Sequence, residues 1–187
     1  MSATKLLVLG VVRMQGRAHG YLVRSELLSW GADEWAHIKF GSIYHALRQL
    51  AKEGLLTSTD IPDWPGRVDY EITPAGDDEF MRLLRDALRH GNNRSDMLGA
   101  ALVLLPALGR DEAVALLRER VDSLSAEQGD LVARVRDATS EKQERAHIRE
   151  LLGLWEHSAA SQAVWAHELI KRLEEGEYVM AGEETSS

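Results

Sequence analysis

The chain has 187 residues, and its 22 Lys and Arg against 30 Asp and Glu give a net charge of −8. This balance excludes an overall basic coat for nucleic acid, although it leaves room for a local basic patch. The chain has no cysteine, which excludes disulfides, a thiol nucleophile and Cys-ligated metal sites. Since no run of about 18 apolar residues occurs, no membrane span is predicted, and we expect a cytoplasmic protein.

Charge is unevenly spread along the chain. Residues 1–56 carry seven Lys or Arg against four Asp or Glu, a net of +3, whereas residues 91–187 have a net charge of −7. The polar stretch His90-Gly91-Asn92-Asn93 is the best candidate boundary. We therefore predict one domain over residues 1–90, a second over residues 91–180 and a flexible tail over residues 181–187.

Apolar periodicity in the first part predicts three helices, over residues 4–14, 21–29 and 42–52, each followed by a glycine. The β-branched segments LLTSTDI and RVDYEIT, on either side of a Pro- and Gly-containing turn, predict a two-stranded hairpin. Thr73 then serves as the N-cap of another helix with Pro74 at its first position. Three helices followed by a hairpin predict a winged helix, whose third helix enters the major groove.

The third predicted helix has two different faces. Ile43, Leu47 and Leu50 fall on one side of the helical wheel and are expected in the core. Groups that read base edges or bind phosphate lie opposite or beside them. This candidate DNA-binding set, with flanking positive charge before the helix and in the hairpin, is Lys39, Ser42, Tyr44, His45, Arg48, Gln49, Lys52 and Arg67. The alternative is an ordinary solvated helix face.

Three motifs resemble the PadR family of transcriptional regulators. FGSIYHALRQLAKEGLL, from Phe40 to Leu56, is similar to the family's recognition helix. His19-Gly20-Tyr21 and the segment from Tyr70 to Gly76 match two further family motifs in the expected order. The resemblance implies a homodimeric winged-helix repressor that releases DNA on binding a small molecule. It places Ser42, Tyr44, His45 and Arg48 on the DNA-facing helix, and Arg67 and Tyr70 in the wing.

The predicted wing departs from the family pattern, which is rich in Arg and Lys. Here Arg67 stands against Asp60, Asp63, Asp69 and Glu71. Tyr21 is expected to pack in the core, since an aromatic residue on a short apolar helix face is more often buried than exposed.

The C-terminal half is predicted to form long helices that dimerise. Apolar residues recur at alternating steps of three and four, which is the pattern of a coiled-coil seam. A second long helix, over residues 142–173, carries its own apolar stripe. The predicted dimerisation residues are Val114, Leu117, Val121, Leu124, Gln128, Leu131, Val135, Leu152 and Trp155. A closed two-fold dimer is the arrangement expected for such helices.

Large aromatic rings beside small residues suggest an effector site on the last helix. Trp155 and Trp165 lie near Ala159, and together they are able to line a pocket for an apolar or aromatic molecule. The alternative is that these tryptophans fill the interface.

The sequence carries no pattern of catalysis or metal binding. No pair of the seven histidines has the spacing of an H-E-x-x-H site, and no nucleophile elbow or phosphate loop occurs. We therefore expect no enzyme, no metal and no cofactor. The predicted function is a dimeric DNA-binding repressor of a palindromic operator, controlled by a small molecule. The alternative is a winged-helix module that binds a protein or sequesters a small molecule without DNA.

Overall fold

The computed structural model describes all residues except 1, 63, 65, 91–94, 140–145 and 184–187. These residues form two compact units. The first comprises residues 1–87 and 94–105, and the second comprises residues 88–93 and 106–187. Within the described part of the chain, no helix is long and apolar enough to cross a membrane.

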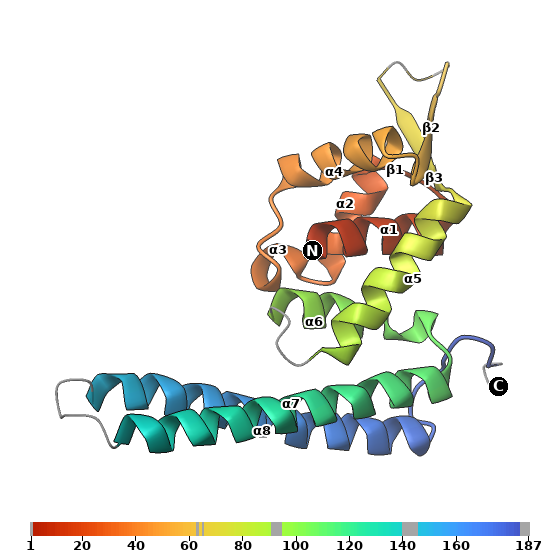
Figure 1. Ribbon diagram of the computed structural model, residues 1–187. Helices are drawn as coiled ribbons and strands as arrows, with labels where there is room; N and C mark the ends of the chain where they lie inside the picture. The colour runs from red at the N-terminus through yellow and green to blue at the C-terminus, as the bar shows by residue number, and fades with distance from the viewer. Residues whose placement is uncertain (1, 63, 65, 91–94, 140–145, 184–187) are drawn as a thin grey trace. The chain divides into compact units, whose positions relative to one another are not determined.

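The first unit contains the elements that the sequence predicts and two short ones that it does not (Figure 1). The predicted helices correspond to α1 (Ala3–Gln15), α2 (Gly20–Ser29), α4 (Phe40–Lys52) and α5 (Pro74–Arg89). The predicted hairpin is β2 (Leu56–Asp60) and β3 (Val68–Ile72). The additional elements are β1 (Arg17–His19) and the single turn α3 (Ala32–Trp35). The expectation of a mainly helical winged helix is confirmed.

The wing is part of a three-stranded antiparallel sheet in the order β1-β3-β2. Tyr70 in the central strand pairs with Ala18 on one side and with Ser58 on the other. The residues just before α2 therefore pair with the hairpin, and β1 and β2 are the two edge strands of this sheet.

The segment from Thr73 to Gly76 joins the wing to α5 through three specific contacts. The Thr73 hydroxyl accepts a hydrogen bond from the Gly76 backbone N–H at 3.0 Å, which confirms the predicted N-cap. The same hydroxyl donates to the Gly54 carbonyl at 2.8 Å. A Cβ on Gly76 would lie 2.0 Å from the Leu55 carbonyl oxygen, so only glycine fits where α5 passes this strand.

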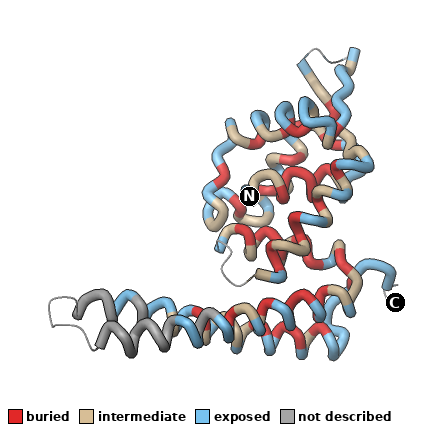
Figure 2. Tube along the Cα trace, in the orientation of Figure 1, coloured by how far each residue is buried: buried red, intermediate tan, exposed pale blue. Residues whose placement is uncertain are grey.

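The core of the first unit lies around α1. Nearly every residue from Leu6 to Val12 is buried, and α1 contacts α2, α4, α6 and the sheet. Figure 2 shows buried residues along α1 and on the inner sides of the helices that pack against it. Helix α6 (Ser95–Val103) belongs to this unit, since Leu104 lies against Gly10 and the Trp35 ring lies against Gly99. This division differs from a single boundary after residue 90.

The second unit is an antiparallel hairpin of two long helices, α7 (Arg110–Thr139) and α8 (Ala146–Glu174). The 3₁₀ turn η1 (Leu105–Ala107) precedes α7 in the chain. Pro106 lies in η1, beyond the end of α6, as its missing N–H favours. The hairpin interior is filled by aliphatic side chains of both helices: Ala113, Val114, Leu116, Leu117, Leu124, Ala159, Ala166, Leu169, Ile170 and Leu173.

Two arginines, Arg110 and Arg120, make polar contacts within this unit. Arg120 is fully buried, and its guanidinium donates to the His90 carbonyl and, at 2.8 Å, to Gln162 Oε1. Arg110 donates to Glu183 and, at 2.7 Å, to the Tyr178 carbonyl. Arg110 thus contacts Glu183 at the start of the segment predicted to be a flexible tail, and that flexibility stays a prediction. Residues 184–187 lie outside the described part of the chain.

Candidate nucleic-acid interface

Helix α4 has the two faces that its sequence predicts. Ile43, Leu47 and Leu50 are buried against the rest of the first unit. Tyr44, His45, Arg48, Gln49 and Lys52 are exposed, and Ser42 is half-buried. The hydrophobic spacing of three and four thus fixes the rotation of the helix and turns its polar groups outward.

Some of the outward side chains already make hydrogen bonds within the protein, and others do not. The Ser42 hydroxyl donates to the Lys39 carbonyl, and the Gln49 amide donates to Glu53 at 2.9 Å. Within the described residues, the side chains of His45, Arg48 and Lys52 make no hydrogen bond or ion pair, and neither does the Lys39 ammonium. These four groups are therefore available to an external ligand without breaking an internal contact.

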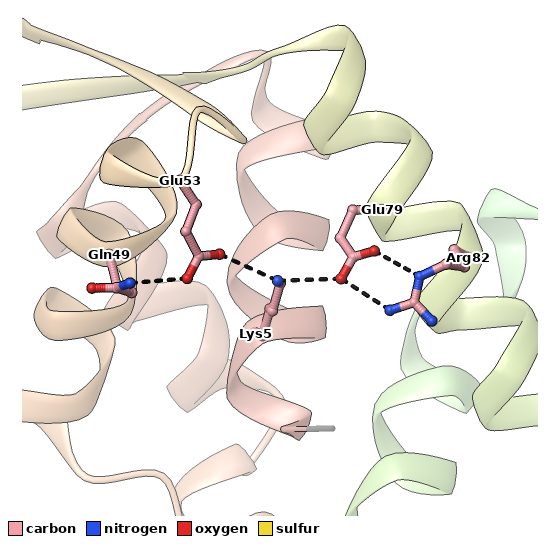
Figure 3. Close-up of polar contacts among 5 residues, drawn as sticks. All are labelled: Lys5, Gln49, Glu53, Glu79 and Arg82. Atoms are coloured by element: carbon pink, nitrogen blue, oxygen red, sulfur yellow. Dashed lines mark hydrogen bonds and ion pairs between the residues drawn. The ribbon is translucent and has the colours of Figure 1, made fainter.

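A chain of charged groups holds the C-terminal end of α4 against α1 and α5 (Figure 3). The Lys5 ammonium lies 3.3 Å from Glu53 Oε2 and 3.2 Å from Glu79 Oε1. Arg82 pairs with the other side of Glu79, with 2.7 Å between Nε and Oε2. The hydrogen bond from Arg82, with help from Lys5, lowers the pKa of Glu79 to about 2. The hydrogen bond from Gln49 also lowers the pKa of Glu53, so both carboxylates are charged at neutral pH and link the end of α4 to α1 and α5 through Lys5.

Aromatic residues surround the N-terminal half of α4. The Tyr44 ring is 38 % exposed and lies so close to Gly20 that a Cβ there would be 2.4 Å from Cε1. This contact explains the glycine in the His19-Gly20-Tyr21 motif. The prediction that Tyr21 packs in the core is wrong, because the residue is 66 % exposed. Within the first turn of α2, Gly20 and Val23 are buried and Tyr21 lies on the outward side, which the single aromatic residue did not reveal.

The wing offers little free positive charge. Arg67, its predicted basic residue, pairs with the buried Asp69 at 3.0 Å and lies 5.7 Å from the centre of the Trp64 ring. Arg17 of the neighbouring strand pairs with Glu71. Tyr70 lies in β3, as the resemblance implies, but it is only 7 % exposed. The free cations of this surface therefore belong to α4 and the residue before it.

One further cation lies near the start of α4. The Arg24 guanidinium of α2 is 4.0 Å from the centre of the Phe40 ring. Sequence reasoning missed this residue because the contact joins two helices and has no local pattern.

Of the predicted dimerisation residues that the structure describes, some are buried within this chain and others are partly or fully exposed. Val114, Leu117 and Leu124 are buried within the α7–α8 hairpin, so these seam positions are occupied by the chain's own helix. Val121 is half-buried. The side chains of the remaining seam residues, Gln128, Leu131, Val135 and Leu152, lie outside the described part of the structure.

The predicted effector residues do not share one environment. Ala159 is buried, Trp165 is half-buried, and Trp155 is 44 % exposed. Leu151, one helical turn before Trp155, and Leu154, three residues after Leu151, are also exposed. These side chains therefore form an apolar surface patch on α8. No group of three or more His, Asp or Glu able to hold a metal occurs among the residues that the structure describes.

Three helices and a wing define a winged helix, with exposed cations on its third long helix that have no partner among the described residues. Residues 8–82 match the model of the transcriptional regulator PadR-like family. This region of the chain is therefore similar to the PadR-like family.

Comparison with solved structures gives matches along most of the chain. Bacillus subtilis PadR in complex with operator DNA is 21% identical, with a TM-score of 0.39 over 90% of this chain and 98% of that one. Bacillus subtilis PadR in complex with p-coumaric acid is 20% identical, with a TM-score of 0.38 over 92% and 99%. The PadR-like regulator of Bacillus cereus is 21% identical, with a TM-score of 0.38 over 92% and 99%. A search of curated proteins gave no match.

Proposed function

We propose that this protein is a sequence-specific DNA-binding repressor that acts as a homodimer and is released from its operator by a small molecule. The observation that carries the proposal is the outward face of α4, where His45, Arg48 and Lys52 have no partner within the described residues. The match of residues 8–82 to the model of a family of transcriptional regulators supports it. The packing of the apolar face of α4 against α1 and α2 supports it further, because base reading needs a positioned helix.

The exposed groups of α4 divide into two roles. Arg48 is placed near the middle of the helix, and an arginine there suits the O6 and N7 acceptors of guanine. Lys39 precedes the helix and Lys52 lies in its last turn, where a flexible ammonium suits phosphate. Arg48 is thus assigned to sequence reading, and the two lysines to positioning on the backbone.

Fluorescence anisotropy with the DNA upstream of the protein's own gene tests this assignment, with a scrambled duplex as control. Arg48→Ala is expected to weaken binding to the native duplex by roughly 1–3 kcal/mol and to reduce the preference over the scrambled duplex. Lys52→Ala is expected to weaken both duplexes alike and to reduce the salt slope by about 1. Equal loss on both duplexes for Arg48→Ala would remove that residue from the reading role.

A dimer would place two copies of α4 on two half-sites of a palindrome. The seam residues Val114, Leu117 and Leu124 are used within the chain, so we assign the partner contact to the exposed patch of Leu151, Leu154 and Trp155 on α8. A second copy of the chain is the partner expected for such a patch, since most oligomers of one chain close by two-fold symmetry.

The acidic wing favours one alternative. Because Asp69 neutralises Arg67, the winged helix has fewer phosphate-binding groups than its shape allows, and it would then bind a protein instead of DNA. Salt separates these functions. DNA affinity falls steeply as salt rises, whereas an apolar protein interface responds weakly.

A further inference from the structure

Two cations from different parts of the first unit lie beside the first residue of α4. Helices α2 and α4 pack against each other, and Arg24 of α2 lies with its guanidinium 4.0 Å from the centre of the Phe40 ring. Phe40 is the first residue of α4, and Lys39 precedes it in the chain. The start of α4 therefore carries an arginine that no local sequence pattern connects to this helix.

The Arg24 guanidinium has hydrogen-bonding capacity that the protein does not use. It makes no hydrogen bond or ion pair within the described residues, and its Nε is buried without a partner. The two terminal amino groups also lack a protein partner but are accessible to solvent. Because a partly buried charge is normally paired, this guanidinium points to an acceptor that comes from outside the chain.

The Phe40 ring positions the Arg24 guanidinium without neutralising it. A guanidinium that stacks on an aromatic face is held by a cation–π interaction, and the N–H groups along its edge stay free to donate. Phe40 is 46 % exposed, which is unusual for so large an apolar side chain. Its contact with Arg24 gives the exposed ring a role at the surface.

The beginning of α4 also lacks the negative charge that a helix N-terminus favours. Acidic side chains in the first turn, or a capping oxygen before it, normally match the partial positive charge of the free N–H groups. Helix α4 has no acidic residue in its first turn, and Lys39 at the N-cap makes no side-chain capping bond. A free lysine thus stands where an anion is preferred, close in the chain to the ring that holds Arg24.

We propose that Arg24 and Lys39 together bind one phosphate group of the DNA backbone, with Phe40 holding Arg24 in position. This inference rests on the proposed DNA-binding function and deepens it by naming a backbone contact outside α4. A guanidinium suits a phosphate because it donates two parallel hydrogen bonds, and an ammonium adds a point charge. Arg48 lies about 12 Å further along α4, so the bound phosphate sets the register of the base-reading side chain.

This phosphate site replaces a contact that the wing does not provide. In the wing, Asp69 occupies the guanidinium of Arg67 at 3.0 Å, so that arginine has a counter-charge within the chain. Arg24 and Lys39 have none among the described residues. The backbone contacts of the first unit are thereby shifted from the wing to the start of α4.

A scan with methylphosphonate linkages tests whether Arg24 contacts a phosphate. Each duplex carries the native upstream DNA with one phosphate replaced by a neutral methylphosphonate, and anisotropy measures its affinity for the full chain. Replacing the contacted phosphate is expected to weaken the unmodified chain about tenfold. The same replacement should weaken Arg24→Gln less than about twofold, because the contact is already lost. A purely structural role for Arg24 predicts equal losses in both proteins at every position.

Three variants and one control separate charge from packing. Arg24→Gln should bind the native and scrambled duplexes about tenfold more weakly and reduce the salt slope by about 1. Arg24→Lys should keep the slope, because it keeps the charge, and bind several-fold more weakly without the paired hydrogen bonds. Phe40→Leu should also keep the slope and bind several-fold more weakly. Arg118→Gln, at a 63 % exposed arginine of α7, should leave affinity and slope unchanged.

The outcomes distinguish the phosphate site from the proposed function. If the unmodified chain binds neither the native nor the scrambled duplex at low salt, the DNA-binding function itself is contradicted before any variant is made. If it binds DNA but the methylphosphonate losses persist in Arg24→Gln, the phosphate site is overturned and DNA binding stands. An unchanged salt slope in Arg24→Gln would likewise overturn the site, because no phosphate contact would have been removed.

Discussion

Gly76→Ala is expected to destabilise the first unit although alanine is the better helix former. The new Cβ would lie 2.0 Å from the Leu55 carbonyl oxygen and 2.9 Å from Ile72 Cγ1. The carbonyl cannot simply turn away, because it accepts a hydrogen bond from the Thr73 N–H at 3.1 Å. Backbone must therefore move by about 1 Å to reach ordinary contact, which is a severe case of overpacking.

The size of this effect follows from three opposing contributions. Overpacking costs about 1–3 kcal/mol, and weakening of the Thr73 hydrogen bond costs about 1 kcal/mol. Replacing glycine by alanine in a helix returns about 0.5–1 kcal/mol. The expected net loss is about 2 kcal/mol, which lowers the melting temperature by roughly 10 °C for a unit of this size.

Thermal and urea unfolding of the full chain measure this change. Gly41→Ala is the matched control, because the site is also helical and a Cβ there meets nothing within 4 Å. It is expected to be neutral or slightly stabilising. Gly20→Ala should cost less than Gly76→Ala, since its new Cβ meets the ring of Tyr44, a 38 % exposed side chain that can rotate. A Gly76→Ala protein as stable as the control would refute the reasoning.

Three other predictions test separate parts of the molecule. The pKa of Glu79 is lowered from 4.5 to about 2, so its ion pairs stabilise the fold fully above about pH 4.5 and are lost as the pH falls towards 2. The free energy of unfolding of Glu79→Gln should therefore fall less steeply between pH 4.5 and 2 than that of the unmodified chain. Arg120→Ala should lower the free energy of unfolding by about 2–4 kcal/mol in chemical denaturation, because it opens a cavity and leaves Gln162 Oε1 unpaired. Arg118→Ala, at an exposed arginine, should lower it by less than about 1 kcal/mol. Equal losses would contradict the burial argument. Leu154→Glu should yield a monomer by size exclusion with light scattering at micromolar concentration, and an unchanged dimer would move the interface elsewhere.

The winged helix was predictable because its signals are local. The spacing of Ile43, Leu47 and Leu50 alone fixes which side of α4 faces outward. Thr73 and Pro74 mark the start of α5 equally well. Strand β1 was not predictable, because three residues carry no alternation and their pairing with β3 depends on a contact more than fifty residues away.

The C-terminal half shows why a coiled-coil seam does not reveal its partner. Alternating steps of three and four in α7 predict that Val114, Leu117 and Leu124 face another helix, and all three are buried in a chain whose α7 and α8 pack together. The pattern is the same whether that helix belongs to a second copy or follows in the same chain. The burial of Arg120 was not predicted, because a charged residue between seam positions is normally exposed to solvent. In the structure its guanidinium donates hydrogen bonds to His90 and Gln162.

The ion pair between Arg67 and Asp69 affects how a DNA-binding regulator of this kind would be distributed between its operator and the rest of the genome. Affinity for random DNA comes almost entirely from phosphate contacts, and a wing with Asp60, Asp69 and Glu71 exposes few groups to make them. Non-cognate DNA vastly outnumbers any operator and normally sequesters most copies of a repressor. In the proposed DNA-binding function, an acidic wing lowers affinity for non-cognate DNA and so leaves a larger share of the molecules for the operator.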